Sequence, residues 1–171
     1  MKNLLQINAS LFAAGGQSSK LGNAMVEAWR KAHPHGEVSV LDLAQNPMPH
    51  LTAERLQAFL TPAEQRTRTQ RDIVAFSDSL IEQLRAADVI VLGLPMYNFG
   101  IPSTLKAYFD HVARAGITFR YTPNGPQGLL LDKKVYVFAA RGGNYAGTPL
   151  DEGKRDAALT QALARIEALA A

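Results

Sequence analysis

A short loop near the amino terminus combines the groups that proteins use to hold an anion. Glycines, hydroxyls and an amide side chain lie directly before an amphipathic segment, at Ser10, Gly15, Gly16, Gln17, Ser18 and Ser19. Backbone N–H groups at a helix N-terminus attract negative charge, so this loop could bind a phosphate. The same serines could instead cap the helix with no ligand present, and both interpretations remain open. The loop matches neither the dinucleotide-binding nor the nucleoside-triphosphate glycine pattern.

A second candidate group follows the most apolar stretch of the chain. Residues 89–94 form a continuous apolar run, which is typical of a strand buried on both faces. Two aromatic rings and polar backbone come directly after it, at Met96, Tyr97, Asn98 and Phe99. Open α/β sheets bind ligands at the carboxyl ends of their strands, so this loop is predicted to face a ligand.

Two later segments are predicted at the same edge. Residues 134–139 are a further predicted strand, followed by a glycine-rich loop at Ala140, Arg141, Gly142 and Gly143. Before that strand, the Asn124-Gly125 pair favours a hairpin that we expect to lie over the carboxyl edge of the sheet. Phe119 and Tyr121 project from this hairpin, where they could pack together or cover a planar ligand.

The elements that must position these loops alternate along the chain. Predicted strands at residues 4–7, 37–43, 89–94 and 134–139 are separated by helical segments, which indicates an α/β fold with a parallel sheet. The helix after residues 89–94 is expected to begin near Ser103, with Ser103 or Thr104 as its cap. A last amphipathic helix is expected over residues 151–170. The 171 residues, with 47% hydrophobic content, predict one domain over residues 1–171.

Composition and spacing argue against several other kinds of chemistry. The chain has no cysteine, and its four histidines lack ligand spacing, so we expect no metal site. No nucleophile elbow or carboxylate pair is evident, and any chemistry must come from a bound cofactor. The net charge of +3 and the interrupted Arg66, Arg68 and Arg71 cluster favour a solvated helix face over nucleic-acid binding. Without a signal peptide or membrane span in the sequence, we expect a cytoplasmic protein with no membrane partner.

Several motifs then occur in order along most of residues 1–149. They are PMYNF at residues 95–99, followed by IPSTLKAYFD, RAGITFRY, NGPQGLL and RGGNY. In these motifs the chain resembles the FMN-dependent NADH azoreductases, also described as NADH:quinone oxidoreductases. The resemblance implies a flavodoxin-like, doubly wound parallel sheet with strand order 2-1-3-4-5. It also implies FMN at the carboxyl edge and a homodimer whose two sites lie at the subunit interface.

The same resemblance implies a role for each candidate residue. Ser10, Gly16, Gln17 and Ser18 would hold the FMN phosphate, although Gly16 replaces an expected serine and so removes one hydroxyl. Met96, Tyr97, Asn98 and Phe99 would meet the isoalloxazine ring and stabilise the negative charge of the reduced flavin. Ala140, Arg141, Gly142 and Gly143 would close over the opposite edge of the ring. Tyr121, with Phe119, would flank the substrate cleft.

The implied reaction is a ping-pong transfer of two electrons from NADH to a quinone or an azo compound. Protons can come from water, so no protein acid or base is required. The alternative is a flavodoxin-like FMN-binding electron carrier without turnover of its own, and a third possibility is a phosphate-binding regulatory domain. A carrier is less favoured because small flavin carriers tend to be acidic, whereas this chain is slightly basic.

The chain departs from the family pattern after Pro149. The family has a further helix and a fifth strand before its last helix, whereas here Asp151 follows almost directly. We therefore expect the fifth strand to be absent. Either the protein lacks this unit, or the sequence omits a stretch near residues 146–152.

Overall fold

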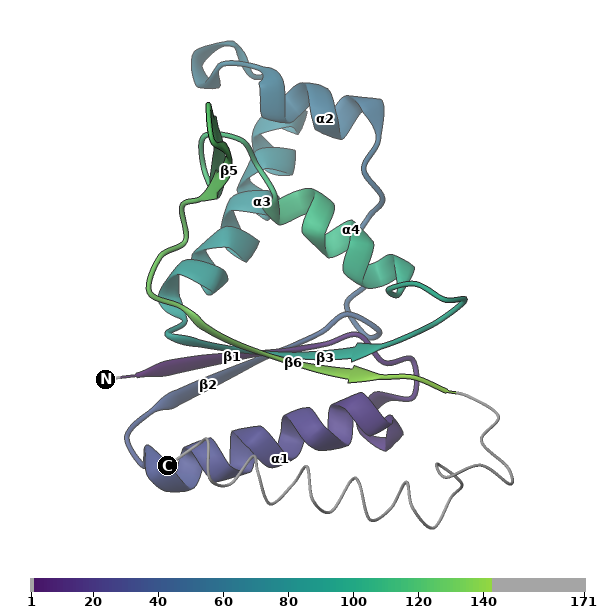
Figure 1. Cartoon of the computed structure of the whole chain (residues 1–171). Helices are drawn as coiled ribbons and strands as arrows, with labels where there is room; N and C mark the ends of the chain where they lie inside the picture. Colours follow the sequence, from purple (N-terminus) through teal and green to yellow (C-terminus); the bar gives the residue numbers. More distant parts are fainter. Residues whose placement is uncertain (1, 143–171) are drawn as a thin grey trace.

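A computed structural model describes residues 2–142 as a parallel sheet with helices on both faces (Figure 1). The sheet contains β1 (Asn3–Asn8), β2 (Glu37–Asp42), β3 (Val89–Pro95) and β6 (Lys134–Ala140), in the order β2-β1-β3-β6. All three pairings are parallel, and Leu5 of β1 is in register with Ser39 of β2 and Ile90 of β3. The predicted doubly wound fold is confirmed, with the first four strands in the predicted order.

The helices form one layer on each side of this sheet. In Figure 1, α1 (Gln17–Ala32) lies below the strands, and α3 (Arg68–Ala86) and α4 (Ser103–Val112) lie above them. The shorter α2 (Ala53–Leu60) packs on α3. Two 3-10 turns, η1 (Ala13–Gly15) and η2 (Ala63–Gln65), complete the helical elements of the described residues.

Side-chain alternation on β1 explains why both faces are covered. Leu4 packs with Met25 and Trp29 of α1, whereas Leu5 packs with Ile81 of α3 and the residues around it. Successive side chains of a strand point to opposite faces, so one apolar run supplies both cores. β3 is buried along nearly its whole length, as its continuous apolar sequence predicts.

The cap of α4 differs from the sequence prediction. The helix begins at Ser103, but the cap position is Pro102 and no side chain caps it. Ser103 and Thr104 are the first two helical residues, so the cap position falls on Pro102, which has no hydroxyl and whose carbonyl accepts from the Leu105 N–H at 3.0 Å. By contrast, Thr67 and Gln70 form a reciprocal capping box at the start of α3.

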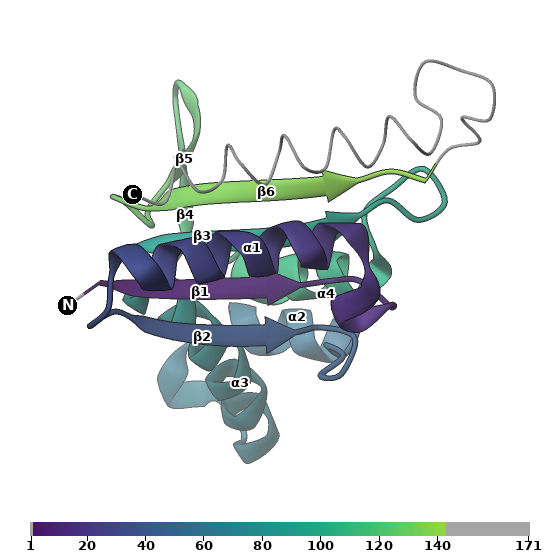
Figure 2. The same cartoon turned by 90° about the horizontal axis from the view of Figure 1, so that it is seen from below.

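The predicted hairpin forms, but its predicted position is wrong. β4 (Phe119–Thr122) and β5 (Gly125–Gly128) pair as an antiparallel ribbon. Figures 1 and 2 both show this ribbon at the end of the molecule opposite the arrowheads of β3 and β6. The chain has travelled back along α4 before the hairpin begins, so the hairpin cannot cover the carboxyl edge of its own sheet.

Three sequence predictions fall outside the described residues. They are the contribution of Gly143 to the last loop, the helix over residues 151–170, and the absent unit after Pro149.

Candidate functional site

The loops after β1, β3 and β6 are joined to one another at the carboxyl edge of the sheet. The Leu11 backbone N–H donates to the Tyr97 hydroxyl at 3.1 Å, which links the first two loops. The Met96 N–H donates to the Ala140 carbonyl at 2.8 Å, which links the second and third. The structure therefore brings together the three loops that the sequence analysis predicted to share a ligand.

The N-terminus of α1 carries two buried hydroxyls without partners. Ser18 and Ser19 are each 1% exposed, and neither hydroxyl has a hydrogen-bond partner among the described residues. The cap position is Gly16, and no side chain caps the helix. The serines are therefore not helix caps, and that interpretation is wrong. A buried hydroxyl without a hydrogen-bond partner is energetically costly. These two hydroxyls therefore favour a bound anion that accepts hydrogen bonds from them.

Ser10 closes this loop from the end of β1. It is 2% exposed, and its Oγ accepts from the Phe12 N–H at 3.3 Å. A Cβ at Gly16 would lie 2.2 Å from Ser10 Oγ, so a side chain at position 16 would collide with Ser10. Gln17 is exposed at the first helical position. The anion-binding loop predicted from Ser10, Gly16, Gln17 and Ser18 is thus one contiguous structure, and it also includes Ser19.

The loop after β3 turns sharply at its tip. Asn98 and Phe99 have positive φ angles of 49° and 61°, and the Phe99 side chain is 97% exposed. Tyr97 and Gly100 exchange two backbone hydrogen bonds across this turn. A left-handed conformation is costly for phenylalanine, and such strain is found at binding sites. The amides of Asn98 and Phe99 donate to no other described residue, which leaves two backbone donors for a ligand.

A buried polar cluster lies between β1 and α1, next to the first loop, and the sequence analysis missed it. Gln6 is 3% exposed, and its Nε2 donates to Asn8 Oδ1 at 3.2 Å and to Asn23 Oδ1 at 2.7 Å. These bonds join β1 to α1 beside the predicted anion-binding loop. Two amide residues in a run of otherwise apolar strand positions were the available signal.

A second missed network fixes the end of α4. Arg114 is 7% exposed, and its Nη1 donates to Ser77 Oγ at 3.0 Å and to Asp78 Oδ1 at 2.5 Å. The guanidinium also lies over the Phe59 ring, 4.9 Å from its centroid. Nearby in α4, burial raises the pKa of the Tyr108 phenol above its ordinary value of 10.0. The network anchors the chain where it leaves α4 for the hairpin.

The remaining predicted residues are divided between two places. Ala140 ends β6, and Arg141 and Gly142 follow it, both exposed beside the Met96 loop. Phe119 and Tyr121 pack edge to face, with ring centroids 5.4 Å apart, and Tyr121 is 77% exposed. They lie on the distant hairpin, so one chain does not bring them to its own three loops.

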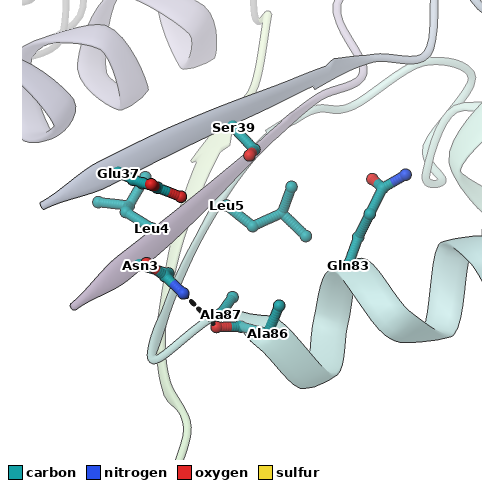
Figure 3. A pocket seen from close by; sticks show the side chains of 8 residues that line it. All are labelled: Asn3, Leu4, Leu5, Glu37, Ser39, Gln83, Ala86 and Ala87. Atoms are coloured by element: carbon teal, nitrogen blue, oxygen red, sulfur yellow. Dashed lines mark hydrogen bonds between the residues drawn. The ribbon is translucent and has the colours of Figure 1, made fainter. Parts of the chain in front are cut away.

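A cavity of about 140 Å³ lies at the opposite edge of the sheet (Figure 3). It is lined by Leu5, Glu37, Ser39 and Gln83, among others, and none of the predicted site residues borders it. Asn3 lies at its rim, where Nδ2 donates to the Ala86 carbonyl at 3.1 Å. This bond joins β1 to the end of α3, so the polar groups here hold two elements together.

Comparison with known proteins gives the family. A family model described as a flavodoxin-like fold matches residues 2–170. An FMN-dependent NADH:quinone oxidoreductase from Cellvibrio japonicus is 59% identical over 91% of this chain and 78% of its own length. The chain belongs to this oxidoreductase family.

Other members of the family agree with this assignment. An FMN-dependent NADH:quinone oxidoreductase from Alcanivorax borkumensis is 60% identical over 87% of this chain and 75% of the relative. An azoreductase from Bacillus anthracis superposes with a TM-score of 0.76 at 32% identity, over 95% of this chain and 82% of the other. No helix in residues 2–142 is long and apolar enough to cross a membrane.

Proposed function

We propose that this protein is an FMN-dependent oxidoreductase that transfers two electrons from NADH to quinones and azo compounds in ping-pong order. The observation that carries the proposal is the pair of buried serine hydroxyls at the N-terminus of α1, which have no partner within the described part of the chain. A phosphate suits this place because it accepts hydrogen bonds from hydroxyls and from the free amides of a helix N-terminus. Relatives named FMN-dependent NADH:quinone oxidoreductase share 59% and 60% of the aligned residues.

The residues present fit FMN from one end to the other. Ser10, Gln17 and Ser18 would hold its phosphate, and Gly16 keeps the space between them free of a side chain. The free amides of Asn98 and Phe99 would donate to the polar edge of the isoalloxazine ring. Ala140, Arg141, Gly142 and Gly143 would border the ring on the other side.

Groups of the protein itself would stabilise the reduced cofactor. A bound FMN would supply the redox chemistry, namely acceptance of a hydride from NADH and transfer of two electrons to the acceptor. Donors fixed in the loop after β3 favour the anionic, reduced form, because they need no reorientation as negative charge develops. The two residues before the strained turn at Asn98 and Phe99 are hydrogen-bonded to the neighbouring loops. Tyr97 bonds to Leu11 of the first loop, and Met96 bonds to Ala140 of the third.

We propose that the active form is a homodimer with its sites at the subunit interface. Exposed apolar side chains in the two loops support this arrangement, since Leu11, Phe12 and Phe99 are 65%, 73% and 97% exposed. The hairpin is also too distant to serve its own loops (Figure 2). Its Phe119 and Tyr121 would therefore flank the substrate cleft of the partner subunit.

An absorbance experiment tests the two half-reactions separately. The protein is reconstituted with FMN and treated with NADH under anaerobic conditions, and benzoquinone is added afterwards. Bleaching of the flavin band by NADH, followed by its return with benzoquinone, is the expected result. Bound flavin that NADH cannot bleach would identify an electron carrier instead, and a failure to bind FMN would contradict the proposal as a whole.

A further inference from the structure

We propose that Ser19, in addition to Ser18, donates its hydroxyl to the flavin phosphate and so replaces the hydroxyl that Gly16 lacks. This inference rests on the proposed function, because it assigns a further residue to the same cofactor site. It is carried by three observations on α1 and on the loop before it: burial, a missing partner, and the space around Gly16.

The first two observations concern the Ser19 side chain itself. Ser19 is 1% exposed, yet its Oγ has no hydrogen-bond partner in the described part of the chain. Serines inside helices usually donate back to a carbonyl of the preceding turn, which Ser19 does not do. Most buried polar atoms are paired, so an unpaired hydroxyl at a helix N-terminus indicates a partner that binds there.

The third observation places this hydroxyl beside Gly16. A Cβ built at Gly16 would lie 3.5 Å from Ser19 Oγ and 2.2 Å from Ser10 Oγ. The two hydroxyls therefore flank the space that a side chain at position 16 would fill. The hydroxyl set around the anion is Ser10, Ser18 and Ser19, and Gly16 provides the space for it.

Position 16 has no room for a side chain, even one that adds a hydroxyl. A Cβ there would also lie 2.9 Å from the Ser10 Cβ, a contact that rotation of the Ser10 hydroxyl cannot relieve. Gly16→Ser, although it adds a hydroxyl to the loop, should therefore weaken the binding of FMN. Tighter binding of FMN by this variant would contradict the predicted collision between position 16 and Ser10.

The decisive experiment compares FMN with riboflavin, which has the same ring and lacks the phosphate. Dissociation constants are measured by quenching of flavin fluorescence on titration of the apoprotein. Ser19→Ala should raise the Kd for FMN about tenfold, the effect of one hydrogen bond to a charged group, and leave the Kd for riboflavin unchanged. If the alanine variant folds poorly, Ser19→Cys is the second variant, because its slightly larger thiol fills the site but donates only weakly, and it should lower the affinity for FMN in the same selective way.

A stability measurement separates binding from a structural role. Because the hydroxyl has no partner in residues 2–142, Ser19→Ala should leave the Tm of the apoprotein unchanged or slightly raised, while the stabilisation by FMN falls. Ser79→Ala is the matched control, since Ser79 is exposed on α3 and donates to the Phe76 carbonyl. This control should leave the ratio of the two flavin affinities unchanged.

The outcomes distinguish this inference from the proposed function. Equal loss of FMN and riboflavin affinity, or no loss of either, would overturn the role of Ser19 while the enzyme assignment stands. Binding of neither flavin by the unaltered protein would overturn both.

Discussion

The Tyr97 hydroxyl accepts a hydrogen bond of 3.1 Å from the Leu11 backbone N–H, and this bond joins the loop after β1 to the loop after β3. One loop contains the proposed phosphate site and the other the proposed ring site. Beyond the pairing of β1 with β3, the two ends of the proposed cofactor site are thus linked through one phenol. The Tyr97 hydroxyl forms no other hydrogen bond with the described residues.

Removal of this hydroxyl should weaken FMN binding without unfolding the protein. A neutral hydrogen bond contributes about 1 kcal/mol, so Tyr97→Phe should raise the Kd for FMN about fivefold. Fluorescence titration with FMN measures the change. Tyr136→Phe, on β6, is the matched control, because the Tyr136 hydroxyl forms no hydrogen bond with residues 2–142. An equal effect in both variants would refute the linking role.

The sequence predicts most of the sheet because apolar runs and strand edges are local properties. The predicted strand at residues 89–94 differs from β3 by one residue, and the three loops meet as expected. The position of the hairpin was not predictable in the same way. It depends on how far α4 carries the chain back and on the contacts of Arg114, which join residues 36 and 37 positions apart.

The serines of the first loop illustrate the same limit at the site. Sequence patterns could not decide between a cap and an anion site, because both use serine before a helix. Two structural observations favour the anion site over the cap. Ser18 and Ser19 are buried, and neither hydroxyl has a hydrogen-bond partner in residues 2–142. The sequence placed Ser19 in the candidate loop, but the resemblance assigned a role to Ser18 and none to Ser19.

The Arg114 network predicts an unequal response to the loss of its two charges. Arg114 is 7% exposed, whereas the Asp78 side chain is 52% exposed. Asp78→Ala leaves a buried guanidinium without its counter-charge and should lower the free energy of unfolding by about 2 kcal/mol. Arg114→Met leaves a carboxylate that water can solvate, so it should cost no more than Asp78→Ala. Urea unfolding at pH 7 measures both values.

The control for this prediction is an exposed ion pair on the same helix. Glu82 and Arg85 are 64% and 47% exposed, so Glu82→Ala should cost less than about 0.5 kcal/mol. If Asp78→Ala behaved like Glu82→Ala, the network would be an ordinary surface contact.

The Tyr108 phenol predicts a loss of stability at high pH. Its hydroxyl is buried without a partner among the described residues, and burial raises its pKa above the ordinary value of 10.0. Above pH 10 the unfolded chain loses this proton while the folded chain keeps it, so the stability falls as pH rises. Tyr108→Phe removes the titrating group and should flatten this part of the profile.

The measurement is the free energy of unfolding from pH 8 to 11 for the protein and for Tyr108→Phe. At pH 8 the variant should be as stable as the unaltered protein or more stable, since it removes an unpartnered buried hydroxyl. Parallel profiles above pH 10 would show that other tyrosines and lysines account for the whole slope. Tyr121→Phe is the control, because Tyr121 is 77% exposed.

The distant hairpin predicts that two different defective subunits can restore each other. Tyr121→Ala should impair use of the quinone and leave FMN binding unchanged, whereas Ser10→Ala with Ser18→Ala should abolish FMN binding and leave the hairpin intact. In a mixed dimer, the subunit that holds FMN receives an intact Tyr121 from its partner. NADH:quinone activity should therefore rise above that of either variant alone when the two variants are mixed and allowed to exchange subunits.

The same experiment contradicts the proposal if activity stays absent. A hairpin that served its own subunit would leave every FMN-holding site without Tyr121, and mixing would restore nothing. Separate tags on the two variants, purified in succession, confirm that the mixed dimers have formed. Because Figures 1 and 2 place the hairpin at the end away from the arrowheads, restored activity would mean that each complete site requires two chains.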